Sequence, residues 1–477
     1  MPSSDPAADL PRWTALLAGW RAGEGPLPVR LAAQIRAAIE RGELRPGDRL
    51  PAERPLAALL GVSRATVVTA LDDLTAGGWL RRRVGSGTRV SATAPRAAPV
   101  LTLRTPVGGA QPAELDFTIA VPLLSDAQRE QLRDASADAF RESVYHPHGL
   151  PDLRARLAEL YTIEGGLPTT PEQVVVTSGA QQAIALIAAT LLRRGDAALL
   201  ETPTYFGAID VFRAAGAALV GVPVLGGGLN PDTFMALARE HGPRLAFLTP
   251  TYQNPTGGVL PLRARERLAA FVQQAKLPTI EDDTLLDLGF SGDPPPPRLA
   301  ALAPAAPIIT VGSLSKLYWA GLRVGWMRLP PGLAAPLGQA KTLADFGGSL
   351  PAQHAALHLL RDPEALRRQR REAVTPARDL LATLLRTELP DWAFELPGGG
   401  QFLWVTLPTP DASRFTHHAA RHGLRLFPGA AMSVTPLSDQ YLRLPFTLDP
   451  ARLPEAVRRL RDAWVSFQGR SGSERLA

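Results

Sequence analysis

The sequence predicts a multidomain protein in which a small helical unit with a β-hairpin is joined by a linker to a large α/β domain and a smaller α+β C-terminal domain. Its 477 residues exceed the usual length of one domain. Apolar residues first recur at helical spacing over about ninety residues, and two short alternating strands follow. From about residue 116, apolar β-branched runs alternate with longer helical patterns, which is typical of a mostly parallel sheet. We therefore expect domains at residues 1–90 and 116–477, with a linker at 91–115.

Composition and charge restrict the classes of protein to consider. Hydrophobic residues make up 45% of the chain and charged residues 20%, and the absence of cysteine excludes disulfides and thiolate metal sites. No segment has the pattern of a signal peptide and no apolar run reaches about 18 residues, so we expect a cytoplasmic protein with no membrane partner. Of the net charge of +6, residues 1–100 hold most, with 14 arginines against nine acidic residues. This excess predicts a polyanionic partner for the N-terminal unit, the alternative being a solvated basic face.

The first helix of the N-terminal unit is expected from Pro28. Leu31, Ile35 and Ile39 recur on one face of it, and Gly42 closes it. A turn, RPGDRLP, separates it from a second short helix, AERPLAALLG, that ends at Gly61. The two helices are therefore predicted to pack at an angle rather than to continue as one.

A third helix, RATVVTALDDLTAGG, follows Ser63, which is a plausible N-cap. Its Val67, Leu71 and Leu74 should face inward, whereas Arg64 and Thr66 should lie at the exposed first turn. The pattern is that of a helix-turn-helix with a recognition helix.

The strands after the third helix form a basic hairpin. The stretch WLRRRVGSGTRV alternates on both sides of Gly85-Ser86-Gly87, as in the wing of a winged helix. Residues 42–67 resemble the signature of the GntR-type winged helix nearly throughout. That resemblance implies that double-stranded DNA is the partner and that the contacts to it come from Arg54, Ser63, Arg64, Thr66 and Gly85. Arg54 as a surface ion-pair partner and Arg64 as a capping charge are the structural alternatives.

Beyond the Ala-, Pro- and Gly-rich linker, the strands of the α/β unit are expected to end at one edge of a sheet, where such folds bind their ligands. The loops at that edge carry polar residues in every case. TSGAQQA follows one strand, ETPTY the next and TPTYQNPTGG a third, while TIEDD ends a strand and GSLSK follows the last.

Lys316, in GSLSK, is one of only three lysines, with Lys276 and Lys341, among 51 basic residues. Arginine stays protonated and forms no imine, so a lysine retained in an arginine-rich chain is a candidate for amine chemistry. A helix N-terminus for a phosphate, an aromatic ring, a carboxylate, an amide and this lysine together indicate a pocket for pyridoxal 5'-phosphate. Each residue alone has an ordinary structural alternative, as a helix start, a core ring, a turn former or a loop cap.

This part resembles the fold-type I aminotransferases from about residue 116 to 465. The resemblance implies a large subdomain at about 145–345 and a small one at 346–477 together with 116–144. It implies Lys316 as the Schiff-base lysine, Asp282 as the partner of the pyridine nitrogen and Arg443 as the clamp on an effector carboxylate. The other implied cofactor contacts are Gly179, Ala180, Gln181, Ser313 and Arg323 for the phosphate, Tyr205, Asn254 and Thr284 for the ring, and Ser315 as a further cofactor-binding residue. Tyr145 would reach the phosphate of a neighbouring subunit, which implies a homodimer.

A GntR-like winged helix joined to an aminotransferase-like domain resembles the MocR-type transcriptional regulators. Thr284 and Ala320 depart from the usual pattern of these regulators, which have tyrosine and proline at the corresponding places. The resemblance implies a regulator that senses pyridoxal 5'-phosphate, an amine or an amino acid, and in which enzymatic turnover is not the main activity. Two alternatives are a working aminotransferase with a DNA-binding appendage and a DNA-binding protein whose cofactor domain is inactive. Effector, operator and direction of regulation are not determined by the sequence.

Overall fold

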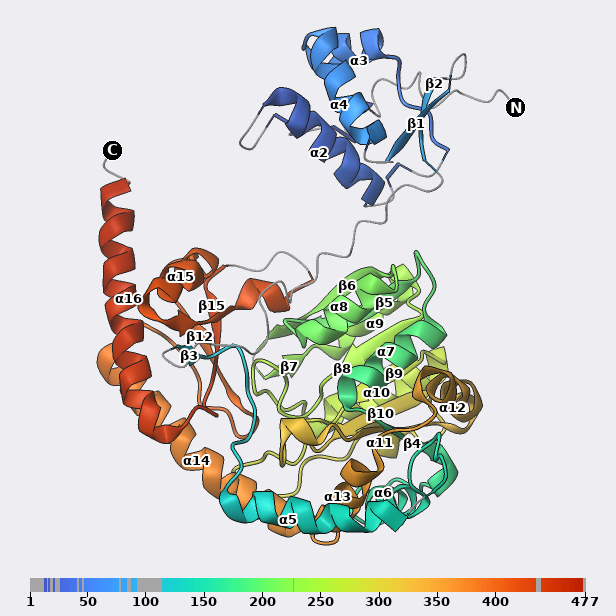
Figure 1. Cartoon of the computed structure of the whole chain (residues 1–477), viewed down its shortest axis with the longest axis vertical. Helices are drawn as coiled ribbons and strands as arrows, with labels where there is room; N and C mark the ends of the chain where they lie inside the picture. The colour runs from blue at the N-terminus through green and yellow to red at the C-terminus, as the bar shows by residue number, and fades with distance from the viewer. Residues whose placement is uncertain are drawn as a thin grey trace. The chain divides into compact units, whose positions relative to one another are not determined.

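The computed structural model describes residues 13–14, 16–17, 20–21, 26–40, 43–44, 47–76, 79–83, 87–91, 114–141, 143–225, 227–434 and 439–474. They fall into two compact units, one within residues 1–100 and one within 101–477, and each is described by itself (Figure 1). The predicted DNA contact Gly85 and residues 92–113 of the predicted linker lie outside the described residues.

In the part of the first unit that the structure describes, the three expected helices and the expected hairpin are present. In order they are α2 (Leu27–Glu40), α3 (Glu53–Leu60), α4 (Arg64–Ala76), β1 (Leu80–Arg83) and β2 (Gly87–Val90). Leu31 and Ile35 of α2 and Val67 and Leu71 of α4 are fully buried in one core, so the predicted inward faces are confirmed. The winged helix-turn-helix is therefore formed.

The turn between α3 and α4 depends on two residues. Gly61 has a φ of 60°, a left-handed conformation that glycine adopts without steric cost, and its N–H closes the end of α3. The Ser63 hydroxyl accepts a hydrogen bond from the Thr66 N–H at 3.1 Å, as an N-cap of α4. Sequence analysis identified both residues because turn and cap chemistry is local.

Within the part of the chain that the structure describes, no single helix is both long and apolar enough to cross a membrane. One bent pair, Glu53–Leu60 with Arg64–Thr75, passes the same test by length and composition alone. These are the two helices of the helix-turn-helix.

The second unit is built on a mixed sheet of eight strands in the order β4-β11-β10-β9-β8-β5-β6-β7. Parallel pairs join β10 to β9, β9 to β8, β8 to β5 and β5 to β6, whereas β11 and β7 are antiparallel to their neighbours. The mostly parallel sheet is thereby confirmed. The strands are β4 (Val174–Thr177), β5 (Ala197–Thr202), β6 (Ala218–Leu225), β7 (Gly228–Leu229), β8 (Leu245–Leu248), β9 (Thr279–Asp282), β10 (Ile308–Ser313) and β11 (Gly325–Arg328).

Helices cover both faces of this sheet, which explains why its strands are continuous apolar runs. On one face lie α7 (Ala180–Leu191), α8 (Phe206–Ala214) and α12 (Pro331–Asp345). On the other lie α6 (Pro151–Ile163), α9 (Pro231–His241), α10 (Leu262–Ala275) and α11 (Leu299–Leu302). Every residue of β4, β8, β9 and β10 is buried.

A smaller sheet of three strands has its own core. Its order is β12-β15-β14, with β12 (Phe402–Thr406), β14 (Phe427–Pro428) and β15 (Tyr441–Pro445), and a separate parallel pair joins β3 (Leu115–Asp116) to β13 (Leu424–Arg425). Helices α14 (Pro363–Glu388), α15 (Ala412–Ala419) and α16 (Leu453–Glu474) pack against it. The aromatic centre consists of Trp392, Phe415, Trp464 and Phe467.

Helix α14 connects the two cores. Leu366 near its start belongs to the core that contains α6 and α13 (Leu350–Leu359), whereas Val374 and Leu381 belong to the core of the small sheet. Figure 1 shows α14 leaving the region of α5 (Asp126–Ser136) and α13 and running alongside α16. The exact boundary between a large and a small subdomain stays a prediction.

Replacing Phe415 by alanine should lower the free energy of unfolding of the second unit by about 3–5 kcal/mol, because a fully buried ring leaves a cavity. The neighbouring rings of Trp392 and Trp464 make tryptophan fluorescence in urea a suitable measurement. Val465→Ala, on α16 and 62% exposed, is the matched control and should shift the midpoint little. Equal midpoints for both variants would contradict the assignment of Phe415 to this core.

Candidate functional site

Lys316 follows β10 and lies half-buried at the carboxyl edge of the large sheet. Its Nζ donates a hydrogen bond to the Ala120 carbonyl oxygen at 2.8 Å, and the Gln401 amide holds its backbone carbonyl at 3.2 Å. Burial, together with the positive charges of Arg443 and Arg370, lowers the pKa of Lys316 to about 8. Its amine is therefore closer to a nucleophilic, neutral form at neutral pH than an exposed lysine is.

Asp282 ends β9, the strand next to β10, and is 5% exposed. Burial raises its pKa to about 6, although hydrogen bonds from Thr284 and the charge of Lys316 favour the ionised form. The Thr284 N–H donates to Asp282 Oδ1 at 3.0 Å. Asp282 is thus a carboxylate at neutral pH, and Thr284, predicted as a ring contact, supports that carboxylate.

The loop between β4 and α7 forms a cradle of backbone N–H groups. Gly179 has a φ of 98° and precedes Ala180, the first residue of α7, and the Gly179 carbonyl oxygen accepts from the Gln182 N–H at 3.1 Å. The N–H groups of Ala180 and Gln181 have no acceptor within the helix. A Cβ on Gly179 would lie 2.7 Å from the guanidinium of Arg323, which also donates to the Ser178 carbonyl oxygen. Glycine at 179 is therefore required for the arginine to approach this helix end.

Ser313 is the last residue of β10, and Ser315 immediately precedes Lys316. The Ser313 hydroxyl donates to the Val324 carbonyl oxygen at 3.2 Å and accepts from the Ser315 N–H at 3.1 Å. The Ser315 hydroxyl is buried without a partner among the described residues. Of these two predicted cofactor contacts, Ser315 therefore has the hydroxyl that no described residue uses.

The remaining predicted ring contacts come from the loops after β5 and β8. Tyr205 immediately precedes α8, is partly buried, and burial raises its pKa to about 12. Asn254 Oδ1 is buried without a partner among the described residues, and so is Oε1 of Gln181, whose Nε2 donates to the Gly207 carbonyl oxygen. These side chains have hydrogen-bonding capacity that the protein itself does not use.

Arg443 lies on β15 of the small sheet and is 3% exposed. Its Nη2 donates to the Thr118 carbonyl oxygen at 2.7 Å, and its guanidinium carbon lies 4.6 Å from the ring centres of Phe402 and Phe427. It forms no ion pair with a carboxylate in the described ranges, and burial lowers its pKa to about 10. Such a guanidinium can bind an anion by donating hydrogen bonds to it.

Arg370 and Gln401 are residues of this region that sequence analysis missed. Arg370, on α14, is 8% exposed, with Nε and Nη2 buried and unpartnered in the described part of the chain. It stands in a run, RRQRR, that shows no sign of which arginine faces inward. Gln401 is fully buried against the backbone of Lys316. The position of Arg370 is revealed only by the face of α14 on which it lies, and that of Gln401 only by the packing next to β12.

Tyr145 differs from the other predicted cofactor contacts because it is 83% exposed. Its ring lies 6.4 Å from that of Phe346, which is also exposed. The structure contains no second chain, so the expected reach of Tyr145 toward a neighbouring subunit stays a prediction.

In the first unit, the predicted DNA contacts Arg54, Ser63 and Arg64 are exposed and Thr66 is partly exposed. Arg54 has no hydrogen bond or ion pair within the described ranges, whereas Arg64 pairs with Glu53 at 2.8 Å. On the hairpin, Arg81 lies opposite Arg89. The surface beside the recognition helix thus carries ion-paired arginines together with an arginine that has no partner among the described residues. Such a surface suits contacts to phosphates.

The residues at the carboxyl edge of the large sheet fit pyridoxal 5'-phosphate. The Ser315 hydroxyl offers a donor and the amide oxygens of Gln181 and Asn254 offer acceptors that no described residue uses, and the glycine at 179 leaves space at the start of α7. Lys316 offers an amine for the aldehyde and Asp282 a carboxylate for a pyridine nitrogen.

Comparison with known proteins agrees with this geometry. The family model of aminotransferase class I and II matches residues 116–460, and that of the gntR family of bacterial regulatory proteins matches residues 27–90. A 2-aminoadipate transaminase of Thermus thermophilus is 34% identical over 363 residues, which are 73% of this chain and 90% of that protein. The crystal structure of LysN, an α-aminoadipate aminotransferase of the same species, has a TM-score of 0.69 at 30% identity and covers 75% of this chain and 94% of its own.

Several relatives cover most of the chain, and the following one is an example. The probable rhizopine catabolism regulatory protein MocR of Rhizobium meliloti is 30% identical and covers 94% of this chain and 96% of its own length. The chain therefore belongs to the aminotransferase class I and II family, and with its gntR-family unit it is a member of the MocR-type transcriptional regulators.

Proposed function

We propose that this regulator binds pyridoxal 5'-phosphate covalently at Lys316 and changes its binding to double-stranded DNA in response to an amine, an amino acid or the cofactor itself. The observation that carries the proposal is the environment of Lys316. A lysine with a pKa of about 8 lies at the sheet edge that also holds Asp282 and a set of unpartnered polar atoms. The cofactor, when bound, supplies an aldehyde that an amine can capture.

An amino acid effector suits the two charged ends of this region. Its amine would compete with Lys316 for the cofactor, and its carboxylate would pair with the unpaired guanidinium of Arg443. Because Arg443 belongs to the small sheet and Lys316 to the large one, an effector held by both would draw the two cores together. A ligand that binds one arrangement better than another shifts the population of the regulator.

We further propose a homodimer. Large apolar side chains at Phe140, Val144, Tyr145, Leu343 and Phe346 are between 59% and 84% exposed. Exposed apolar groups of this kind favour burial against a partner. Tyr145 would then be available to the phosphate site of the second subunit.

Transamination is the second candidate function, favoured by the 34% identity to a 2-aminoadipate transaminase. Lys316, Asp282 and Arg443 are the residues that such a reaction needs for amine capture, ring protonation and carboxylate binding. Single-turnover and steady-state assays with an amino donor and 2-oxoglutarate separate the two functions, since a regulator needs no turnover.

Lys316→Ala should abolish covalent attachment of pyridoxal 5'-phosphate, because Lys341 is paired with Asp345 within α12 and Lys276 lies at the end of α10. The visible absorption band and the adduct trapped by borohydride should both disappear. Lys276→Ala is the control, because Lys276 is exposed at the end of α10. An adduct that persists in the Lys316 variant would assign the attachment to another lysine.

The rate of attachment should rise with pH and level off above about 8, because the pKa of Lys316 is lowered from 10.5 and only the neutral amine reacts. Stopped-flow absorbance of the cofactor-free protein mixed with pyridoxal 5'-phosphate measures this profile. Arg443→Gln removes a like charge, so the midpoint should move to higher pH. A wild-type midpoint near 10.5 would show that burial does not perturb this amine.

Arg54→Ala should weaken binding to a mixed-sequence DNA duplex and reduce the slope of log affinity against log salt by about 1, as expected for one lost phosphate contact. Fluorescence anisotropy at several salt concentrations gives both quantities. Arg263→Ala, an exposed arginine on α10 of the second unit, is the matched control. An unchanged slope in the Arg54 variant would exclude this arginine from the DNA interface.

A further inference from the structure

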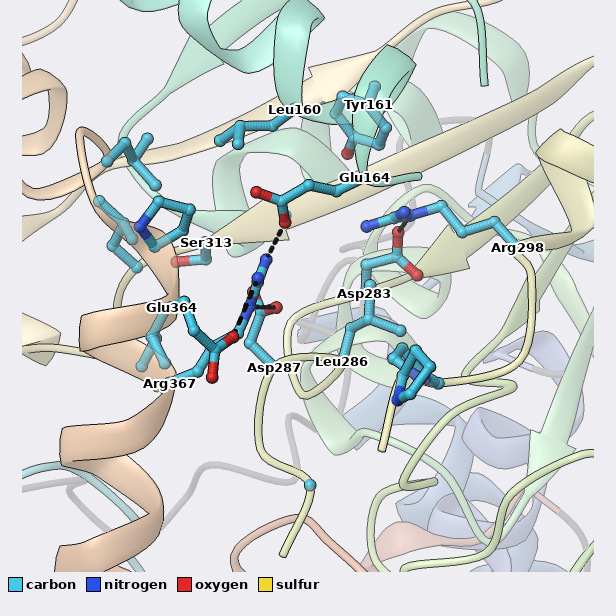
Figure 2. Close-up of a pocket in the computed structure, with 18 of the residues that line it drawn as sticks. Leu160, Tyr161, Glu164, Asp283, Leu286, Asp287, Arg298, Ser313, Glu364 and Arg367 are labelled. Carbon is cyan, nitrogen blue, oxygen red and sulfur yellow. Dashed lines mark hydrogen bonds and ion pairs between the residues drawn. The ribbon is translucent and has the colours of Figure 1, made fainter. Parts of the chain in front are cut away.

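A second cavity lies in the aminotransferase-like unit, lined by residues other than Lys316, Asp282 and Arg443. Its volume is about 380 Å³, within the range of small-molecule sites. Helix α6, the loop after β9 and the first turns of α14 line it, as Figure 2 shows with Leu160, Asp287 and Arg367.

The charged lining of this cavity is unbalanced. Five carboxylates stand against three guanidinium groups. Arg367 is held between Glu164 at 2.6 Å and Asp287 at 2.7 Å (Figure 2). Arg298 is held by Asp283 at 2.6 Å. These ion pairs account for three of the five carboxylates, those of Glu164, Asp287 and Asp283.

The two remaining carboxylates are those of Glu364 and Asp293. Glu364 lies 3.6 Å from Arg367 and 3.8 Å from Arg371, and its side chain is 61% exposed. Asp293 is exposed and has no ion pair in the ranges that the structure describes. The cavity therefore has negative charge available for a cation.

Tyr252 offers the cavity a hydrogen-bonding group that no described residue uses. It lines the cavity, the residue is 7% exposed, and its hydroxyl has no hydrogen-bond partner among the described residues. The hydroxyl oxygen is not one of the fully buried unpartnered atoms, so it is accessible to a ligand in the cavity. Burial raises the pKa of Tyr252, so the group stays a neutral hydroxyl that can accept a hydrogen bond from a cation.

Another part of the lining is apolar. It includes Leu160, Leu314, Leu317, Leu360 and the indole of Trp326. Such a wall favours a ligand with a hydrocarbon or aromatic body.

We propose that this cavity is a second ligand site, for an organic ammonium compound with an apolar body. The body packs on the leucines and Trp326, and the ammonium group donates to the Tyr252 hydroxyl and pairs with Glu364 or Asp293. The site is separate from the capture of an effector amine at Lys316 and does not depend on it.

The position of the cavity explains how an occupant acts on the rest of the unit. Tyr252 is two residues before Asn254, Asp283 follows Asp282, and Ser313 belongs to both regions. Arg367 and Glu364 lie in the first turns of α14, the helix that connects the two cores. A ligand here contacts three cofactor-site loops and the start of that helix.

The probe is N,N-dimethylphenethylamine, a tertiary amine that cannot condense with an aldehyde. Titration calorimetry of the full chain should detect its binding, and 3-phenylpropionate, with a carboxylate in place of the ammonium, should not bind. Leu160→Trp should abolish binding by filling the cavity. Tyr252→Phe should weaken it about three- to tenfold, since one hydrogen bond is lost. Glu364→Gln should weaken it and reduce its dependence on salt.

Leu225→Trp, at an 80% exposed position on β6, is the matched control for added bulk and should bind as the wild type does. Circular dichroism of each variant verifies that it is folded. No binding to the wild type, equal binding of 3-phenylpropionate, or full affinity in both Leu160→Trp and Tyr252→Phe overturns the proposal.

Lys316→Ala separates this inference from the proposed function. That variant should bind the tertiary amine with wild-type affinity while it loses the covalent cofactor. Loss of amine binding in Lys316→Ala would place the amine at the cofactor site and overturn the second site. A covalent adduct in that variant would contradict the proposed function alone.

Discussion

The parallel pairing of β9 with β10 is the constraint on which the candidate site depends. In this register Asp282 lies opposite Val311, so the carboxylate that ends one strand is next to the loop that carries Lys316. Because β4, β5 and β8 run in the same direction in the same sheet, the loops with Gly179, Tyr205 and Asn254 end at that edge as well. The hydrogen-bond ladder of the sheet thus brings residues about a hundred positions apart in the chain to one edge.

Electrostatics at this edge favour an anionic ligand. Lys316, Arg370 and Arg443 are cations in a largely buried region, and Asp282 supplies the negative charge beside them. Burial of unpaired cations is costly, and the lowered pKa values of all three groups express that cost. A phosphate on the α7 cradle and a carboxylate at Arg443 would compensate these charges, so ligand binding is expected to stabilise the folded unit. The same cost makes a neutral amine accessible at Lys316.

The second cavity has the opposite charge. Carboxylates exceed guanidinium groups there, and the Tyr252 hydroxyl has no hydrogen-bond partner among the described residues. Two regions of opposite preference, one for anions and one for a cation, therefore share the loops after β8, β9 and β10. Coupling between them needs no long pathway, because single residues such as Ser313 belong to both.

The sequence by itself determined the local features of this protein. The caps at Gly61 and Ser63, the three helices of the N-terminal unit and the apolar strands of the large sheet follow from turn chemistry and periodicity, which act over a few residues. The loop motifs likewise identified Lys316, Asp282 and Gly179 as candidates. Only the tertiary structure decided how these residues assemble. It also decided that Arg370 faces inward, that Thr284 supports Asp282 and which residues line the second cavity. Burial, pKa and unpartnered hydrogen-bonding groups depend on which distant segments pack together, and no spacing along the chain encodes that.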